Sequence, residues 1–322
     1  MEKIVFRHVS KSYNSYEAVN NLSFKIMEGE TLVLIGTSGC GKTTTLKMIN
    51  RLIEPTKGEI EIDSKDVSEY NLIELRRSIG YVIQSIGLFP HITIGKNISI
   101  IPELMNWPKE RIASRVDELL YMVGLEPEVY RDRFPAELSG GQQQRIGVAR
   151  ALAADPPIIL MDEPFGALDP ITREQLQNEF LSLIHTIKKT IVFVTHDIFE
   201  AVKIADRLAL MDRGEIVQIG SPKDIVERPA NRFVKDFLGR HSFQLSLLLV
   251  RLSEVMIDIK TATAEDRDFE GSPFLTLDEP ILEALSYFKQ NAVDVIPIKG
   301  SNGELKGFVT KDAVRDRILT GI

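Results

Sequence analysis

Cysteine is nearly absent from this sequence of 322 residues, in which Cys40 is the single example. One cysteine cannot form an intramolecular disulfide, so the composition is typical of a protein from a reducing compartment such as the cytoplasm. Cys40 lies within a glycine-rich loop, where we expect its small side chain to fill space. The alternative is that the Cys40 thiol makes the loop sensitive to alkylation.

Long hydrophobic runs are also absent. No uninterrupted apolar stretch approaches the ~18 residues that a membrane-spanning helix requires, so we expect any transport pore to belong to other chains. The first ten residues, MEKIVFRHVS, have no long apolar stretch after their charges. This pattern argues against a signal peptide and favours a first strand.

Basic residues are fewer than acidic ones. The chain has 39 Lys and Arg against 46 Asp and Glu, which gives a formal net charge of −7. A nucleic-acid-binding protein would be expected to carry a basic surface, so we predict no nucleic-acid partner. The length of the chain and its hydrophobic content of 43% predict two domains with ordinary cores.

Glycine is concentrated in a loop that predicts phosphate binding. The segment GTSGCGKT, Gly36–Thr43, follows an apparent buried strand over Thr31–Gly36, and a helix is expected from Lys42 onward. The glycines let successive N–H groups turn toward phosphate oxygens, while the helix N-terminus adds partial positive charge. Lys42 would contact the β and γ phosphates, and Thr43 would bind Mg²⁺. The predicted nucleotide-binding residues here are Gly36, Thr37, Ser38, Gly39, Cys40, Gly41, Lys42, Thr43 and Thr44.

Two carboxylates and a histidine follow apolar runs further along the chain. Ile158–Met161 is typical of a strand buried on both faces, and Asp162 after it is predicted to hold Mg²⁺. Glu163 is predicted to orient or deprotonate the attacking water, and His196, after a second buried strand, to contact the γ phosphate. Each feature has a structural alternative when taken singly. The acidic pair could be a turn, His196 could be a packed structural residue, and the glycine loop could be an ordinary turn with a solvated lysine. Their common order along the chain favours catalysis.

Five ordered motifs resemble the nucleotide-binding subunit of ATP-binding cassette (ABC) transporters over about residues 1–239. They are the phosphate loop, a glutamine, LSGGQ, the acidic strand end and the histidine. The resemblance implies that Tyr13 stacks on adenine, that Gln84 links Mg²⁺ to a membrane subunit, and that Asp169 lies in a loop between two sites. Thr37 stands where the family commonly has proline, but it supplies a backbone amide, so little consequence is expected. The predicted catalytic residues are Lys42, Gln84, Glu163 and His196, and the predicted metal ligands are Thr43, Gln84 and Asp162.

LSGGQ is the signature that separates this family from other phosphate-loop ATPases. The resemblance implies that ATP lies between the phosphate loop of one subunit and the signature of another. This chain has one copy of each motif and no internal repeat, so we expect a dimer, with an identical second subunit as the first choice. Ser139 also predicts the N-cap of a helix running to Ala154. The signature residues are Leu138, Ser139, Gly140, Gly141 and Gln142.

Whole segments narrow the resemblance further. Residues 81–98, 105–120 and 162–177 are similar to the ATPases of osmoprotectant importers, which take up glycine betaine, carnitine, choline or proline. The similarity implies uptake through separate permease subunits, served by a solute-binding protein, with this chain on the cytoplasmic face of the membrane. In this family Gln84–Pro90 faces the membrane subunit, and packing of its apolar residues in a local core is the alternative. Importers of amino acids or metals, and a soluble ABC ATPase, are the alternatives.

The segment 251–322 resembles a single cystathionine β-synthase (CBS) motif after a connector at 240–250. It contains a predicted helix over Ile281–Gln290 and two strands around a turn at Ser301–Gly303. Such motifs normally come in tandem, so this copy would pair across the dimer, be a remnant, or merely hold the subunits together. An unpaired copy is expected to expose the sheet face that includes Val293, Val295, Ile296 and Ile298.

These observations predict an α/β chain in two parts. Residues 1–239 would form a phosphate-loop ABC ATPase domain, with a mixed sheet core and a helical subdomain, and residues 251–322 a small α+β regulatory module. ATP and Mg²⁺ are the expected cofactors. Asp312 follows Thr310 by two positions, whereas the CBS family's aspartate follows by three, so ribose binding by the module is in doubt.

Overall fold

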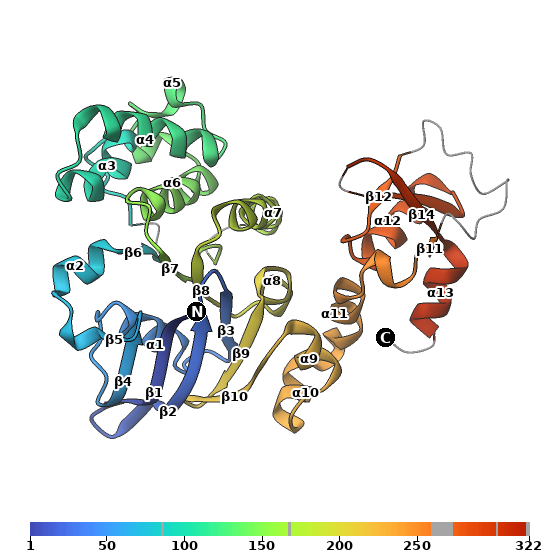
Figure 1. Ribbon diagram of the computed structural model, residues 1–322, viewed down its shortest axis with the longest axis horizontal. Coiled ribbons are helices and arrows are strands. Elements are labelled where there is room, and N and C mark those ends of the chain that lie inside the picture. Colours follow the sequence, from blue (N-terminus) through green and yellow to red (C-terminus); the bar gives the residue numbers. More distant parts are fainter. Residues whose placement is uncertain (85–86, 167–168, 259–272, 301, 320–322) are drawn as a thin grey trace. The chain divides into compact units, whose positions relative to one another are not determined.

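The computed structural model describes residues 1–84, 87–166, 169–258, 273–300 and 302–319. Packing divides the chain into two compact units, Met1–Ser221 and Pro222–Ile322. Each unit has its own sheet and helices, as Figure 1 shows. Among the described residues, no helix combines the length and apolar composition needed to cross a bilayer.

The centre of the first unit is a six-stranded sheet. Its strands, in spatial order, are β10 (Glu215–Gly220), β9 (Arg207–Asp212), β3 (Thr31–Gly36), β8 (Thr190–Thr195), β7 (Ile158–Asp162) and β6 (Ile79–Val82). Neighbouring strands are parallel except β10, which pairs antiparallel with β9. Strands β3, β7 and β8 are buried throughout because they are continuous apolar runs. The carboxyl ends of these parallel strands meet at one edge, where all the predicted catalytic motifs begin.

A second sheet of the first unit is antiparallel and packs on a shared core. Its strands, in spatial order, are β2 (Tyr16–Met27), β1 (Glu2–Tyr13), β4 (Lys57–Ile62) and β5 (Lys65–Asp66). The first strand expected at the N-terminus is therefore confirmed as β1. Phe6 and Phe24 stack across β1 and β2 with ring centroids 4.4 Å apart. Their cluster includes Leu32 and Leu34 of β3, so the two sheets share one apolar core.

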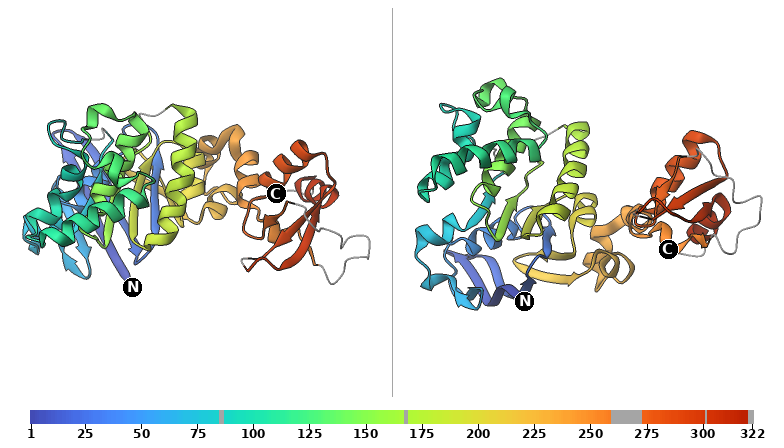
Figure 2. Two further views of the ribbon diagram at one scale, coloured as in Figure 1. Left: turned by 90° about the horizontal axis from the view of Figure 1, so that it is seen from above. Right: turned by 45° about the horizontal axis from the view of Figure 1, so that its top comes forward.

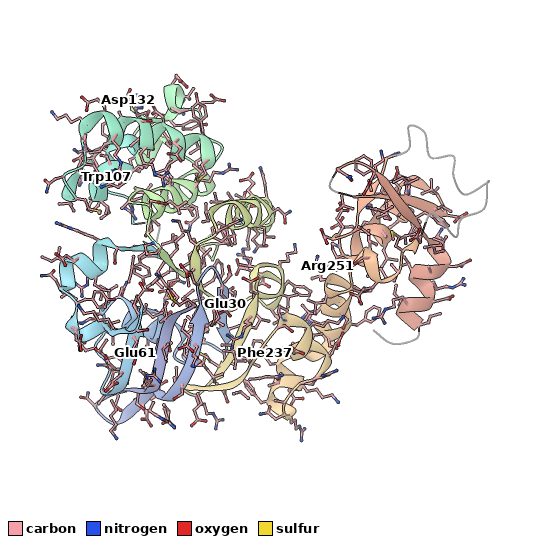
Figure 3. All side chains as sticks on the ribbon, in the orientation of Figure 1. Glu30, Glu61, Trp107, Asp132, Phe237 and Arg251 are labelled. Carbon is pink, nitrogen blue, oxygen red and sulfur yellow. The ribbon has the colours of Figure 1, made fainter. Side chains whose placement is uncertain are left out.

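Helices follow the strands, and some of them form a separate group beyond the six-stranded sheet. The helices of the first unit are α1 (Lys42–Ile49), α2 (Leu72–Arg77), α3 (Ile94–Leu104), α4 (Lys109–Met122), α5 (Pro127–Tyr130), α6 (Gly140–Leu152), α7 (Pro170–Ile187) and α8 (Ile198–Ile204). Helices α3, α4 and α6 pack on one another, and Figures 1 and 2 show them grouped with α5. This group is the expected helical subdomain. Trp107 between α3 and α4 lies under the Arg111 guanidinium, 3.6 Å from the ring centroid, and is labelled in Figure 3.

The second unit contains a four-stranded sheet and helices. Its strands, in spatial order, are β11 (Ile257–Asp258), β14 (Leu305–Thr310), β13 (Val295–Lys299) and β12 (Leu275–Thr276). Its helices are α9 (Pro222–Glu227), α10 (Arg232–Leu238), α11 (Ser242–Leu249), α12 (Ile281–Asn291) and α13 (Lys311–Leu319). The predicted helix is confirmed as α12, and the two predicted strands as the antiparallel pair β13 and β14. Residue 301, in the predicted turn between them, lies outside the described residues.

The division between the units differs from the expected boundary near Gly239. The second unit begins at Pro222 because α9 packs against α11. The segment expected as a connector, residues 240–250, is largely the packed helix α11. Its apolar residues Leu245, Leu247 and Val250 are buried, which explains why the segment folds rather than lying in solvent.

The expectation of an exposed sheet face in this unit is wrong for Ile296 and Ile298. Both side chains are fully buried in a core that includes Phe288 of α12 and Val314 of α13. Val293 and Val295 are half-buried. The unit's own helices cover the sheet, so the apolar face does not require a second copy.

Candidate functional site

The phosphate loop joins the end of β3 to the start of α1, as the sequence predicted. Gly36 has φ of 154° and Gly41 has φ of 105°, conformations that strain any residue with a side chain. A Cβ at Gly36 would lie 2.1 Å from the Met211 carbonyl oxygen, and one at Gly41 would lie 2.4 Å from that of Ala18. Both positions therefore require glycine. Gly41 is also the N-cap of α1, so the helix directs its free N–H groups into the loop.

Lys42 spans the phosphate loop. Its Nζ donates hydrogen bonds to the carbonyl oxygens of Gly36 at 2.9 Å and Thr37 at 3.0 Å. The side chain is 5% exposed, and its ammonium lies 3.7 Å from the sulfur of Cys40. Burial raises the pKa of the Cys40 thiol, although Lys42 opposes this shift. The thiol is therefore a neutral, buried group, in agreement with the space-filling role expected for it.

Thr43 and Asp162 meet although they are far apart in the sequence. The Thr43 hydroxyl donates to Asp162 Oδ1 at 2.8 Å, and Tyr81 of β6 donates to Asp162 Oδ2 at 3.5 Å. Burial, with the neighbouring Asp162 carboxylate, raises the pKa of Tyr81, so the phenol remains a donor. A hydroxyl and a carboxylate side by side are oxygen donors of the kind that Mg²⁺ prefers. Sequence reasoning did not find Tyr81, since a tyrosine in a strand has no distinctive signal.

Two predicted site residues, Gln84 and His196, converge on a third, Glu163. Glu163 Oε2 accepts from His196 Nδ1 at 3.1 Å and from Gln84 Nε2 at 3.4 Å. Glu163 follows the buried end of β7 with a left-handed φ of 45°, and its N–H donates to the carbonyl oxygen of Val194 in β8. This turn lets Asp162 stay buried while Glu163 is half-buried at the sheet edge. The acidic pair is thus divided between the Thr43 side and the Gln84 and His196 side.

The signature residues form a helix start. Ser139 caps α6 by accepting from the Gln142 N–H at 3.3 Å, and Gln142 Oε1 accepts from the Ser139 N–H at 3.0 Å. This reciprocal capping box was the expected N-cap. Leu138 is buried, Gly140 begins the helix, and a Cβ on Gly141 would lie 2.9 Å from Thr172 of α7. Ser139 accepts from the Gln142 N–H, while the N-terminus of α6 at Gly140 and Gly141 is oriented to favour an anion beyond the helix end.

Asp169 caps the neighbouring helix α7. Its side chain accepts from the Thr172 N–H at 3.1 Å. The two residues before it, 167 and 168, lie outside the described residues. The contact between Thr172 and Gly141 places the start of α7 beside the signature helix.

Two tyrosines flank the loop from the hairpin of β1 and β2. Tyr13, the predicted adenine platform, is 43% exposed, and Lys11 lies over its ring at 5.0 Å from the centroid. Tyr16 pairs with Tyr13 in the hairpin, and its hydroxyl donates to the Gly39 carbonyl oxygen at 3.0 Å. Sequence reasoning did not find this contact because Tyr16 belongs to no motif. The exposure of Tyr13 is consistent with stacking on a base.

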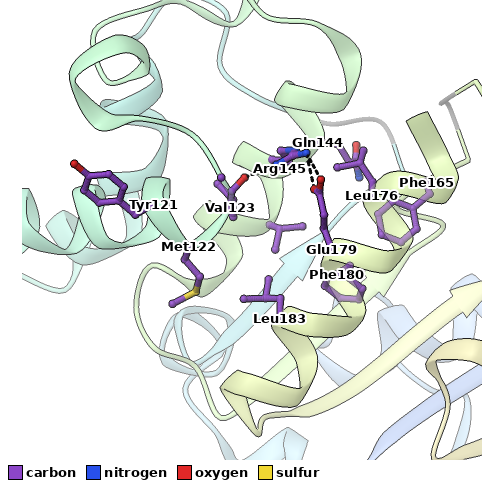
Figure 4. Close-up of a pocket in the computed structure, with 12 residues that line it drawn as sticks. Tyr121, Met122, Val123, Gln144, Arg145, Phe165, Leu176, Glu179, Phe180 and Leu183 are labelled. Carbon is purple, nitrogen blue, oxygen red and sulfur yellow. Dashed lines mark hydrogen bonds and ion pairs between the residues drawn. The ribbon is translucent and has the colours of Figure 1, made fainter. Parts of the chain in front are cut away.

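A separate apolar pocket lies between α6, α7 and the end of α4 (Figure 4). It has a volume of about 400 Å³, and Phe165, Leu176 and Phe180 are among its lining residues. Arg145 and Glu179 form a hydrogen bond of 2.7 Å at its side. None of the predicted nucleotide-binding or catalytic residues lines it, so it is distinct from the phosphate site.

Comparison with known sequences gives consistent results. A family model described as ABC transporter matches residues 19–166. The choline transport ATP-binding protein OpuBA of Bacillus subtilis is 50% identical over 313 residues, which are 97% of this chain and 79% of that protein. The osmoprotectant import ATP-binding protein OsmV of Salmonella typhimurium is 45% identical over 316 residues, 98% of this chain and 80% of that protein.

Comparison with solved structures supports the same fold. The ATP-binding cassette MJ0796, in a dimeric post-hydrolysis state bound to ADP and Pi, matches with a TM-score of 0.61 and 36% identity. The match covers 68% of this chain and 98% of that one. The structure of cbiO1 from Clostridium perfringens matches with a TM-score of 0.65 and 26% identity, over 76% of this chain and 100% of that one.

Proposed function

The chain belongs to the ATP-hydrolysing subunits of the ABC transporter family, and we propose that it powers import of a compatible solute of the glycine betaine, carnitine, choline or proline type. The observation that carries the catalytic part is the convergence of Gln84 and His196 on Glu163, beside the Asp162 and Thr43 pair. The identity of 50% to a choline transport protein supports the solute class.

Nucleotide binding is assigned to the phosphate loop. The N–H groups from Gly36 to Thr44 and the start of α1 would bind the phosphates, with the Lys42 ammonium exchanging its bonds to carbonyl oxygens for bonds to β and γ oxygens. Tyr13 would stack on the adenine. Thr43, Asp162 and Gln84 would hold Mg²⁺, which would supply positive charge to stabilise the negative charge that develops on the phosphate oxygens.

Hydrolysis is assigned to Glu163 and His196. Glu163 Oε2, at the sheet edge, would accept a proton from, or orient, the water in line with the γ phosphate. His196 holds the same oxygen through Nδ1, so its ring would be fixed while Nε2 contacts the γ phosphate. Gln84 is the second donor to Glu163. It would exchange this bond for Mg²⁺ when nucleotide binds.

The complete site would form between two copies of the chain. One copy supplies the phosphate loop and the other the signature residues, with Ser139 and Gly141 closing on the γ phosphate. The capping box of Ser139 and Gln142 preorganises the N-terminus of α6 for this contact. Asp169 at the start of α7 would link the two sites. The dimeric state of MJ0796 supports this arrangement.

A groove in the first unit suits the membrane partner. Its volume is about 360 Å³, and its apolar lining includes Ile79, Ile83, Ile100 and Phe89, which is 53% exposed. The groove lies between β6, at the edge of the sheet, and α3. Several of its lining residues are close to Gln84 in the sequence. An amphipathic helix of a permease subunit would fill such a groove. The expected docking patch at Gln84–Pro90 contributes Gly87 and Phe89 to it, while residues 85 and 86 lie outside the described residues.

The remaining parts of the proposal concern location and regulation. The chain would act at the cytoplasmic face of the membrane, bound to permease subunits that a solute-binding protein serves. Residues 251–322 would form a CBS-like regulatory module. In that module the Thr310 hydroxyl accepts from the Ala313 N–H at 3.1 Å, and Asp312 pairs with Arg315. Both groups have protein partners, in agreement with the doubt about ribose binding.

Reconstitution tests the proposed function. The chain, its permease and its solute-binding protein are placed in lipid vesicles, and ATP hydrolysis is measured with glycine betaine, choline, carnitine, proline and, for comparison, histidine. A compatible solute is expected to stimulate hydrolysis, and Lys42→Ala is expected to abolish the stimulation by weakening nucleotide binding. Stimulation by histidine alone, or by no solute, would contradict the assignment.

A further inference from the structure

Glu200 is a buried carboxyl group that the assigned catalytic residues do not include. It lies in the first turn of α8 and is 5% exposed. Its Oε1 accepts from Gln177 Nε2 at 3.2 Å, and its Oε2 accepts from the Thr195 hydroxyl. A buried carboxyl group costs free energy, even when it is hydrogen-bonded, relative to an apolar side chain of similar size. Packing therefore does not explain why glutamate stands here.

The two partners of Glu200 belong to two different parts of the site. Thr195 immediately precedes His196, and its hydroxyl accepts from the Asp197 N–H at 3.0 Å. Gln177 lies in α7, the helix that begins at Asp169. Glu200 therefore connects both neighbours of the histidine to the helix that follows the Asp169 loop. Glu163, His196 and Glu200 also line one small cavity of about 10 Å³.

The hydrogen-bond pattern is that of an ionised carboxylate. The Thr195 hydroxyl accepts from Asp197, so its own hydrogen is donated to Glu200, and the Gln177 amide donates to the other oxygen. Both carboxyl oxygens thus accept, as a carboxylate does. A protonated Glu200 would carry its hydrogen on one of these oxygens, and that oxygen would accept more weakly from its donor.

The electrostatic surroundings place the titration of Glu200 near neutral pH. Burial raises its pKa to about 7, and Asp197 adds to this shift. The hydrogen bonds from Thr195 and Gln177, and the positive charge of Arg173 in α7, oppose it. The ionised and protonated forms are therefore both populated in the physiological range.

We propose that Glu200 is a positioning residue that fixes the position of His196 relative to α7 through Thr195 and Gln177, and that its ionised form is the competent one. The proposal rests on the assigned contact of His196 with the γ phosphate. Because the phosphate loop and Tyr13 belong to other elements, the expected effect of Glu200 is on kcat and not on KM.

The test is the pH dependence of ATP hydrolysis by full-length protein. Glu200→Gln keeps the shape but cannot accept at both positions, so kcat is expected to fall about tenfold at pH 8. Its KM is expected to change less than about twofold. The rise of wild-type kcat through about pH 7 should contain a step that Glu200→Gln lacks. Wild-type kcat and an unchanged pH profile in Glu200→Gln would overturn the proposal.

Glu30→Gln is the matched control. Glu30 is also a buried carboxylate, 8% exposed, but it pairs with Arg207 at 3.0 Å just before β3, at the end of that strand opposite the phosphate loop; Figure 3 labels it. Glu30→Gln is expected to keep the wild-type pH profile. Loss of the same step in Glu30→Gln would attribute it to general destabilisation and overturn the proposal.

Two further variants keep the result interpretable. If Glu200→Gln does not bind nucleotide and is therefore misfolded, Gln177→Ala removes the α7 contact while leaving Glu200, and the same fall in kcat is expected. His196→Ala, and the double variant that combines His196→Ala with Glu200→Gln, separate the assigned role of His196 from the proposed role of Glu200. If His196→Ala keeps full activity, the assigned role of His196 fails and the Glu200 proposal with it. If His196→Ala loses activity, the double variant should be no worse than His196→Ala alone, and full additivity would overturn the Glu200 proposal only.

Discussion

Two neighbouring carboxylates organise the site at the scale of single residues. Asp162 accepts from Thr43 and Tyr81, whereas Glu163 accepts from Gln84 and His196. The left-handed backbone at Glu163 separates their directions. One carboxylate therefore faces the helix of the phosphate loop, and the other faces the sheet edge where water can attack.

Glu163→Gln tests the role of Glu163 as the base. The amide keeps the shape of the side chain and can still contact His196, but it cannot accept the proton. ATP affinity is expected to stay within about twofold of wild type, while kcat falls by about 10²–10⁴-fold. Phosphate release and nucleotide binding measure the two effects. Near-normal turnover would remove Glu163 from this role.

Glu200 also predicts how stability depends on pH. Its pKa is about 7 in the folded chain against an ordinary glutamate value of 4.5, so the folded state holds the proton more tightly. The stability that protonated Glu200 contributes is present in full below about pH 4.5 and is lost as the pH rises through 7, a loss of about 3 kcal/mol. Glu200→Gln cannot ionise and should gain by that amount relative to wild type between pH 4.5 and 8.

Urea unfolding of both proteins without nucleotide, at several pH values, measures this difference. Glu30→Gln serves again as the control, because it replaces a buried carboxyl group that pairs with Arg207 and contacts neither Thr195 nor Gln177. A constant difference between Glu200→Gln and wild type across the range would show that Glu200 does not titrate near neutral pH.

Helix starts are the recurring device at the scale of elements. Gly41, Ser139, Asp169 and Asp197 are the N-caps of α1, α6, α7 and α8. Three of these caps accept hydrogen bonds with a side chain, whereas Gly41 leaves the first turn of α1 open. An uncapped start offers its N–H groups to phosphate directly, and a polar cap offers both its side chain and the helix N-terminus.

Ser139→Arg tests the signature helix as half of a shared site. The long side chain would occupy the γ-phosphate contact and remove a cap worth about 0.5–2 kcal/mol. Combined with Glu163→Gln, which is expected to block hydrolysis, it is expected to prevent the ATP-driven dimer that Glu163→Gln alone should form. Light scattering with and without ATP gives the oligomeric state.

A cap variant at another helix provides the control for this dimer experiment. Asn71 caps α2 through the N–H groups of Ile73 and Glu74. Asn71→Arg makes a similar change outside the signature, so it should leave ATP-driven dimerisation intact. Dimerisation of the Ser139→Arg protein at saturating ATP would contradict the shared site.

Two compact units define the chain at the scale of the whole molecule. The first unit carries every residue assigned to nucleotide binding and hydrolysis. The second unit begins with α9 and includes α11, whose residue Leu247 belongs to the same core as Ile296 and Ile298. A regulatory role of the second unit therefore has to be tested by removing it at its own boundary.

Truncation after Ser221 is expected to give a better-behaved ATPase than truncation after Gly239. The longer product keeps α9 but lacks α11, which packs on it, so Ile225 and Val226 would lose their cover. Exposed apolar surface forfeits about 25 cal/mol per Å² and promotes aggregation. Soluble yield and ATP binding of both products measure the difference. Equal behaviour of the two would contradict the boundary at Pro222.

The sequence by itself determined the elements whose local signals are strong. Continuous apolar runs predicted β3, β7 and β8, and turn glycines with a following lysine predicted the phosphate loop, because these patterns restrict the backbone locally. The helix of the C-terminal module and its two strands were predicted for the same reason. The order of the motifs was enough to predict the family to which the chain belongs.

Tertiary structure decided which side chains meet and what is buried. The contact of Tyr16 with Gly39, the bond of Tyr81 to Asp162 and the link from Glu200 to α7 join residues whose own segments carry no motif. Burial of Ile296 and folding of α11 likewise depend on which helices cover the second sheet. Local patterns act over a few residues, whereas these contacts depend on packing between distant segments, and so only the folded chain specifies them.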